Sequence, residues 1–136
     1  MTGKKLAYGG VVVDSEGRIL LREPTNHFDD YVWTFPKGRP DGGETQEETA
    51  LRETLEETGV FAEIVDRIPG TFPGGVTDNI YFLMRPTGRT ESPCTRETAS
   101  VLWTPPDKAR RLIGETTNPV GLKRDLAVLE AAIALR

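Results

Sequence analysis

The sequence predicts a single domain of the α+β class, in which a mixed β-sheet is covered by helices. The chain has 136 residues, a length at which one domain is the default. Residues 46–58 carry a well-delimited helical pattern, and short apolar runs of strand length lie on both sides of it. No repeat or low-complexity segment interrupts the chain. We therefore expect one domain over residues 1–136.

The segment before the helix is predicted to be rich in strands. Leu6–Val13 and Arg18–Glu23 are apolar runs separated by a turn-forming Asp-Ser-Glu-Gly sequence, which predicts a β-hairpin. A polar loop with aromatic residues follows at 24–32. Trp33–Pro36 is then predicted as a short strand that leads into a glycine-rich loop.

The glycine-rich loop precedes the helix directly. Residues 36–43, PKGRPDGG, contain three glycines and two prolines. This composition suits a backbone that bends around a polyanion, and Lys37 and Arg39 supply the countercharge. We predict that both cations contact phosphate.

The helix has clear ends and two different faces. Thr45 is a predicted N-cap, Glu48 completes a capping box, and Gly59 is the expected left-handed residue at the C-terminal end. At roughly 100° per residue, one arc is suited to packing and contains Ala50, Leu51, Thr54, Leu55 and Thr58. The opposite arc contains Arg52, Glu53, Glu56 and Glu57.

The three glutamates of that second arc are the most informative feature of the helix. Glu53, Glu56 and Glu57 have i, i+3 and i+4 spacing, at which like charges repel by about 0.2–0.5 kcal/mol per pair. A helix selected only for stability would avoid this pattern. Oxygen ligands for a hard divalent cation explain it better.

Strands and two further helices are predicted after this helix. Phe61–Arg67 is a predicted strand, and a Pro/Gly-rich connection occupies Pro69–Gly75. Asn79–Arg85 is predicted to be a central strand because it contains the apolar run YFLM. A loop without periodicity is expected at Thr87–Thr95, followed by a strand at Ala99–Thr104.

The C-terminal region is predicted to be helical. Pro105 and Pro106 begin a short helix that continues to Ile113. From Asn118, with Pro119 in the first turn, an amphipathic helix runs to the end, and its apolar face contains Leu122, Leu126, Leu129, Ala132 and Ile133. This face is expected to cover the sheet, so we predict a monomer, with a weak homodimer through this helix as the alternative.

Composition excludes several classes of protein. A net charge of −4 and a pI near 5.1 argue against a general binder of nucleic acid or anionic membranes. No run approaches the ~18 apolar residues of a membrane span. The single Cys94 permits no internal disulfide and favours a reducing, cytoplasmic location. His27 is the only histidine, so a histidine-based triad or metal site is not expected.

The motif around the helix resembles the signature of the Nudix hydrolases, G-x5-E-x7-R-E-U-x-E-E-x-G-U, in which U is a bulky apolar residue. The chain matches it at Gly38, Glu44, Arg52, Glu53, Glu56, Glu57, Gly59 and Val60. The one departure is Thr54 at the first U position. The resemblance implies a Nudix-type α/β/α sandwich and metal-dependent hydrolysis of a nucleoside diphosphate linked to another group.

The resemblance also implies roles for these residues. Magnesium, with manganese as a substitute, is expected to be held by Glu56 and Glu57 with a main-chain carbonyl near Gly38. Glu53 is expected to be a further ligand or the general base. Arg52 and Glu44 are expected to form a supporting ion pair that fixes the loop against the helix.

Outside the motif, one further carboxylate and one aromatic residue are candidates for the site. Glu97 precedes a Trp-containing strand, and family members often place a metal-binding glutamate there. The competing interpretations are that Glu97 is a solvated loop residue, or that Glu91 takes the role instead. Trp33, Phe35, Phe72 and Tyr81 are candidates for stacking on a base, and Tyr81 is predicted to bind substrate. Each of the four also suits a core position.

The substrate prediction is a small nucleotide. The run WTFPKGRPDGGE at 33–44, with YFLMR at 81–85 and WTPPDKA from Trp103, resembles the branch that cleaves diadenosine polyphosphates. We therefore expect hydrolysis of dinucleoside polyphosphates. The alternatives are (d)NTPs or other nucleotides, an mRNA 5′ end, or a non-catalytic binding module, which would be expected to lack one of the motif carboxylates.

Overall fold

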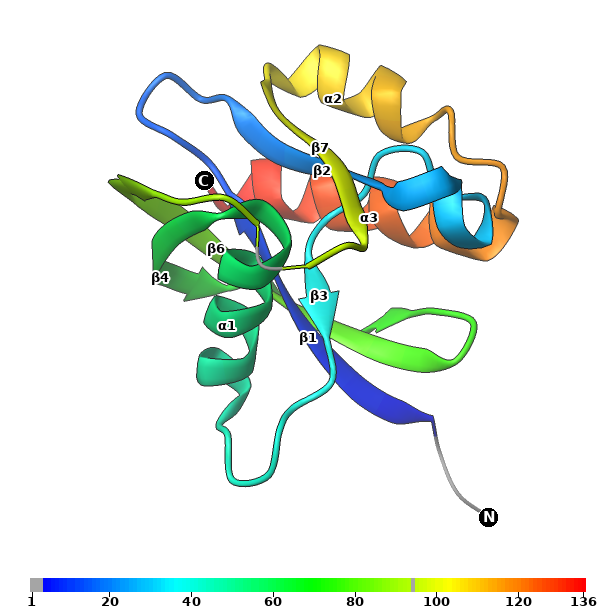
Figure 1. Cartoon of the computed structure of the whole chain (residues 1–136). Coiled ribbons are helices and arrows are strands. Elements are labelled where there is room, and N and C mark those ends of the chain that lie inside the picture. The colour runs from blue at the N-terminus through cyan, green and yellow to red at the C-terminus, as the bar shows by residue number, and fades with distance from the viewer. Residues whose placement is uncertain (1–3, 94) are drawn as a thin grey trace.

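A computed structural model of the chain describes residues 4–93 and 95–136 and confirms the α+β class (Figure 1). Cys94 lies outside the described residues. The elements in chain order are β1 Lys5–Val12, β2 Ile19–Pro24, the 3-10 segment η1 Thr25–Asp30, β3 Lys37–Gly38, α1 Gln46–Thr58, β4 Val60–Arg67, β5 Phe72–Pro73, β6 Thr77–Thr90, β7 Thr98–Thr104, α2 Pro106–Ile113 and α3 Pro119–Leu135.

The main sheet is mixed, as predicted, and β6 is one of its central strands. The strand order is β3-β1-β6-β4, with β5 also paired to β6, while β2 and β7 form a separate two-stranded sheet. β1 runs parallel to β6 and antiparallel to β3. Gly9 of β1 lies opposite both Lys37 and Tyr81, so the start of the glycine-rich loop is fixed directly to the centre of the sheet.

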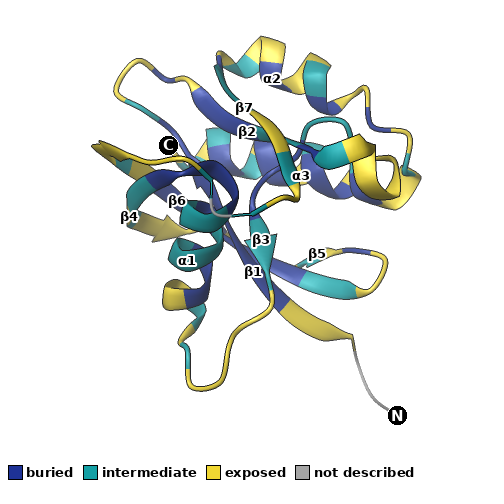
Figure 2. Ribbon diagram, in the orientation of Figure 1, coloured by how far each residue is buried: buried dark blue, intermediate teal, exposed yellow. Residues whose placement is uncertain are grey.

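The main sheet has a hydrophobic core on each face, and because side chains alternate along a strand, the central strands β1 and β6 contribute to both cores. On β1, Val11 packs with α2 and α3, while Val12 packs with the α1 side. On β6, Tyr81 and Phe82 divide in the same way. The result is an α/β/α sandwich, with α1 on one face of the sheet and α3 on the other (Figures 1 and 2).

The predicted N-terminal hairpin is wrong. β1 and β2 belong to different sheets, and the turn between them is closed by a bridge between Val13 and Ile19 and by the Asp14 backbone N–H, which donates to the Arg18 carbonyl at 3.0 Å. β6 pairs with β1 along its whole length and β3 takes the other edge at Tyr8 and Gly9, while β2 pairs with β7.

Two other predicted boundaries also change. Trp33–Pro36 is not a strand: only Thr34 bridges to Arg22, and β3 starts one residue after Pro36, which has no backbone donor. The loop predicted from Thr87 begins later, because β6 continues to Thr90 and pairs there with Val60 of β4.

Helix α1 has the predicted ends. Thr45 accepts from the Glu48 backbone, and the Glu48 side chain accepts from the Thr45 backbone. Gly59 adopts a left-handed φ of 75° and ends the helix. Thr54, the departure from the motif, is fully buried against Met84 of β6, so a threonine fills the position at which the motif has a bulky residue.

The part of the chain that the structure describes contains no helix long and apolar enough to cross a lipid bilayer.

Gly59 and Gly88 provide a matched test of the packing at the junction between α1 and β4. Both have positive φ, but a Cβ at Gly59 would run into the carbonyl oxygen of Glu91, whereas a Cβ at Gly88 meets nothing within 4 Å. We expect Gly88→Ala to lower the free energy of unfolding by about 1–2 kcal/mol through conformational strain alone. Gly59→Ala should lower the free energy of unfolding by about 1–3 kcal/mol more than Gly88→Ala does, because the backbone at Glu91 must also move. Urea denaturation measures both, and equal losses would contradict this account of the α1–β4 junction.

Candidate active site

Strand β3 lies against helix α1, so the glycine-rich loop meets the acidic residues of the helix. The Lys37 backbone N–H donates to Oε1 of Glu57 at 3.2 Å. At Gly38, a Cβ atom would overlap the carboxylate of Glu53. Glycine is therefore required at this point, because any side chain would displace the glutamate.

Two of the three glutamates on the acidic face of α1 are withdrawn from water at this contact. Glu57 is only 6% exposed. Burial raises the pKa of Glu57 to about 8; Arg22, with its Nε 3.6 Å from Oε1, opposes the rise, and the Glu53 carboxylate adds to it. Burial also raises the pKa of Glu53. Two acidic groups are thus held close together in a desolvated position, where a cation would favour their ionised forms.

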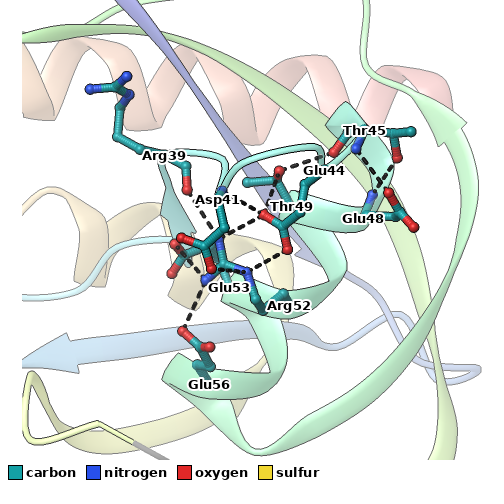
Figure 3. A network of polar contacts seen from close by, with 9 residues as sticks. All are labelled: Arg39, Asp41, Glu44, Thr45, Glu48, Thr49, Arg52, Glu53 and Glu56. Carbon is teal, nitrogen blue, oxygen red and sulfur yellow. Dashed lines mark hydrogen bonds and ion pairs between the residues drawn. The ribbon is translucent and has the colours of Figure 1, made fainter.

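Arg52 joins the acidic face to the loop (Figure 3). Its Nε and Nη2 donate to the two carboxylate oxygens of Glu44 at 2.7 and 3.0 Å. Nη2 also donates to the Arg39 carbonyl at 3.0 Å, and Nη1 contacts Glu53 and Glu56 at 3.3 and 3.2 Å. The predicted Arg52–Glu44 pair is therefore present in the structure, as a two-point contact.

Glu44 is itself held firmly. Hydrogen bonds from Arg52, and then from the Asp41 backbone, lower the pKa of Glu44 to about 2. The Thr49 hydroxyl donates to the same carboxylate at 3.1 Å. Glu44 therefore remains ionised as the partner of Arg52 and fixes the loop to the second turn of α1.

The residues fit a hard divalent cation, although they do not form a closed cage. Over residues 4–93 and 95–136, no three His, Cys, Asp or Glu side chains are already gathered into a cluster that could hold a metal ion, and Arg52 contacts both Glu53 and Glu56. Magnesium does not need an all-protein cage, because it usually keeps several waters and takes one or two carboxylates plus substrate oxygens. The close pair Glu53 and Glu57 beside Gly38 can supply such ligands.

A pocket of about 480 Å³ opens beside these carboxylates. Lys37, Glu57 and Glu97 all line it, so the structure brings the predicted second carboxylate to the same cavity as the motif. Glu97 lies in the segment before β7, and its carbonyl accepts from Nη2 of Arg22 at 2.7 Å.

Burial lowers the pKa of Lys37, and the positive charge of Arg124 adds to this effect.

The structure corrects the expectation for Tyr81 and separates Arg39 from the pocket. Tyr81 is fully buried and packs edge-on against Phe35 and Phe72, at 6.3 and 6.0 Å between ring centroids. It cannot contact a substrate there, because the face of the central strand that carries it is covered by the α3 core. Arg39 is exposed, and its side chain points away from the carboxylates in Figure 3.

Sequence reasoning missed two arginines that line the pocket. Arg22 and Arg124 both line it. The Arg124 side chain is only 3% exposed, its Nε donates to Oδ1 of Asp125 at 3.0 Å, and its guanidinium carbon lies 5.2 Å from the centre of the Tyr31 ring. Oδ2 of Asp125 accepts from the Thr34 hydroxyl at 2.6 Å. A signal existed, because Asp125 lies on the same helical face as the predicted apolar residues of α3.

Comparison with protein families gives one match that covers most of the chain. The model of the NUDIX domain matches residues 3–124. Among curated relatives, a MutT-like protein of Streptomyces ambofaciens is 31% identical over 112 residues, which is 81% of this chain and 70% of that protein. A putative 8-oxo-dGTP diphosphatase of Bacillus subtilis (strain 168) is 34% identical over 100 residues, covering 72% of this chain and 64% of that protein.

Solved structures have the same fold. The NUDIX domain of Shewanella oneidensis NrtR, in a complex with ADP ribose, superposes with a TM-score of 0.76 at 18% identity, covering 99% of this chain and 90% of that chain. Three other curated relatives are matched over only 35%, 24% and 36% of their own lengths.

The burial of Glu57 gives a pH dependence of stability. Its pKa rises from 4.5 to about 8 on folding, so between these values the folded state binds more protons than the unfolded state. Stability must therefore fall as pH rises through this range. We expect the melting temperature in excess EDTA to decrease from about pH 5 to about pH 8, and Glu57→Gln to flatten the decrease. Glu47→Gln, on the exposed first turn, should show the same dependence of melting temperature on pH as the wild type. If Glu57→Gln also shows the wild-type dependence, the raised pKa of Glu57 is not its cause.

Proposed function

This chain belongs to the Nudix family, and from that premise we propose that it is a metal-dependent pyrophosphohydrolase that cleaves a phosphoanhydride bond in a nucleoside diphosphate-linked substrate. The observation that carries this proposal is the contact of β3 with α1. It places Glu53 and Glu57, desolvated and close together, beside a pocket that also contains Lys37. We propose, further, that residues 1–136 act as one catalytic domain.

Each residue of the contact has a proposed role. The principal metal ligands are Glu56, Glu57 and the Gly38 carbonyl, and Glu53 and Glu97 are the further candidate ligands. A divalent cation, Mg²⁺ or Mn²⁺, supplies charge neutralisation and a polarised water when bound. Glu53, whose pKa burial raises, is our candidate for accepting a proton from the attacking water.

The remaining residues hold the glycine-rich loop in place or bind the phosphate chain. Arg52 and Glu44 hold the loop on α1, so that Gly38 stays against Glu53. Lys37 neutralises the phosphate chain at the inner end of the pocket. Arg39 is the weaker candidate for phosphate contact, because it is exposed and does not line the pocket.

The proposed substrate is a dinucleoside polyphosphate. The resemblance of residues 33–44, 81–85 and the stretch from Trp103 to the diadenosine polyphosphate branch supports it. A nucleoside triphosphate is the second candidate, favoured by the similarity to the Bacillus subtilis protein named as a putative 8-oxo-dGTP diphosphatase. All motif carboxylates are present, which counts against a non-catalytic binding module.

The activity test is metal-dependent release of products from diadenosine tetraphosphate and a panel of nucleoside triphosphates. We expect turnover with Mg²⁺, none in excess EDTA, and a loss of about 10²–10³-fold in kcat for Glu57→Gln, because a metal ligand is lost. Glu47→Gln, which carries the same change on the exposed first turn, should keep wild-type activity. Undiminished turnover in EDTA would refute the metal-dependent mechanism, and no turnover on any nucleotide would favour the binding module.

Glu97 can be tested separately from the helix. We expect Glu97→Gln to lower kcat with Mg²⁺ by about 10-fold or more, because it removes a carboxylate from the pocket wall opposite α1. Glu91→Gln tests the competing interpretation and should change kcat by less than about 2-fold. Steady-state kinetics at several Mg²⁺ concentrations measures both variants. If Glu91→Gln shows the larger loss, the assignment of the second carboxylate is wrong.

A further inference from the structure

The two most exposed large apolar side chains among the described residues line the same pocket. Phe28 is 77% exposed and Val76 is 86% exposed, and both line the cavity that contains Lys37 and Glu57. Exposed apolar side chains that converge on one cavity indicate a ligand-binding surface more than chance exposure.

The two residues come from separate segments. Phe28 belongs to η1, which connects β2 towards β3, and Val76 lies in the turn between β5 and β6. In Figure 1 both segments lie on the same side of the molecule, to the right of the chain that leads into β3. Figure 2 shows that both have exposed tips. The pocket is therefore bordered by one apolar residue from each segment.

The backbone that carries Phe28 has an unusual left-handed conformation on both sides of that residue. Asn26, His27, Asp29 and Asp30 all have positive φ, between 48° and 66°. Non-glycine residues rarely adopt this region, and clusters of them occur where the surrounding structure holds a functional segment in place.

Hydrogen bonds at both ends hold this segment. The Thr25 backbone and hydroxyl donate to the carbonyls of Glu97 and Arg96 at 2.8 and 2.6 Å. The Asn118 side chain and the Thr117 backbone donate to the carbonyls of Asp29 and Asp30, both at 3.1 Å. The segment thus turns Phe28 towards solvent at the pocket rather than into the core.

Other aromatic residues are less suited to hold a flat ligand. Phe35 lines the pocket but is only 1% exposed, and Tyr81 is fully buried. Tyr31 lines the pocket with its ring in contact with Gly121 and the guanidinium of Arg124. Phe28 is the most exposed of the three aromatic residues that line the pocket.

We propose that Phe28 and Val76 form a nucleobase subsite at the mouth of the pocket. The base stacks on the Phe28 ring with Val76 on its other side, while the phosphate chain extends inward to Lys37 and the carboxylates. The proposal rests on the proposed function for its ligand class. Because both contacts are apolar or stacking, they secure the base without selecting one base over another.

The test is direct binding of two probes that differ in having a base. Calorimetry measures a methylene-bridged ATP analogue and inorganic tripolyphosphate, each with Mg²⁺, on the wild type and on Phe28→Ala and Val76→Ala. We expect Kd for the ATP analogue to rise about 10-fold or more in Phe28→Ala and about 3-fold in Val76→Ala. Kd for tripolyphosphate should stay within about 2-fold.

Matched controls separate stacking from general damage. Val65→Ala removes an equally simple exposed side chain, 53% exposed on β4 and outside the pocket, and should leave both Kd values unchanged. Phe28→Tyr keeps the ring and should bind the ATP analogue as the wild type does. An unchanged Kd for the ATP analogue in Phe28→Ala overturns the subsite, as does an equal loss for tripolyphosphate. Because binding is measured without turnover, a protein that binds the analogue but hydrolyses nothing refutes only the proposed function.

Discussion

The site depends on a contact between two elements: the backbone of β3 against the carboxylates of α1. A single N–H of Lys37 reaches Glu57, and the missing side chain of Gly38 leaves space for Glu53. This contact removes two acids from water, which a stable fold would normally avoid. Arg52, paired with Glu44, keeps the arrangement together by joining the helix to the loop at several points.

The rest of the fold brings other segments to this contact. β3 is placed by β1, whose other edge is taken by β6, so the glycine-rich loop starts from the middle of the sheet. The small β2–β7 sheet then supplies a further wall of the pocket, with Arg22 on β2, where its Nε lies 3.6 Å from Oε1 of Glu57, and Glu97 just before β7. The hydrogen bond between Arg22 and the Glu97 carbonyl links the two residues.

Local features could be predicted from the sequence, whereas long-range partners could not. The ends of α1 depend on Thr45, Glu48 and Gly59, which act within one turn, and the structure confirms all three. The partner of β2 depends on which strands occupy the edges of β1, which no local pattern records. The prediction that Tyr81 binds substrate fails for a related reason. The apolar run of β6 indicates a central strand, but it does not show that the face carrying Tyr81 is covered by α3.

The charged residues of α3 show the same limit. Asp125 lies on the apolar face of its helix, a pattern that predicts a buried polar partner but not its identity. The partner hydroxyl of Thr34 is 91 residues earlier in the chain. The sequence indicates a polar loop with aromatic residues around Phe28, but it does not show where the Phe28 ring lies, because that depends on four residues in the left-handed region.

The pocket draws its walls from nearly the whole length of the chain, from Arg22 near the start to Arg124 in the last helix. A ligand bound in this pocket therefore links segments as far apart in the sequence as β2 and α3. Ligand binding increases the free energy of unfolding, and at concentrations well above Kd the increase grows with the logarithm of the ligand concentration. A high concentration of such a ligand would therefore also protect the protein from proteolysis, because it lowers the population of unfolded chains.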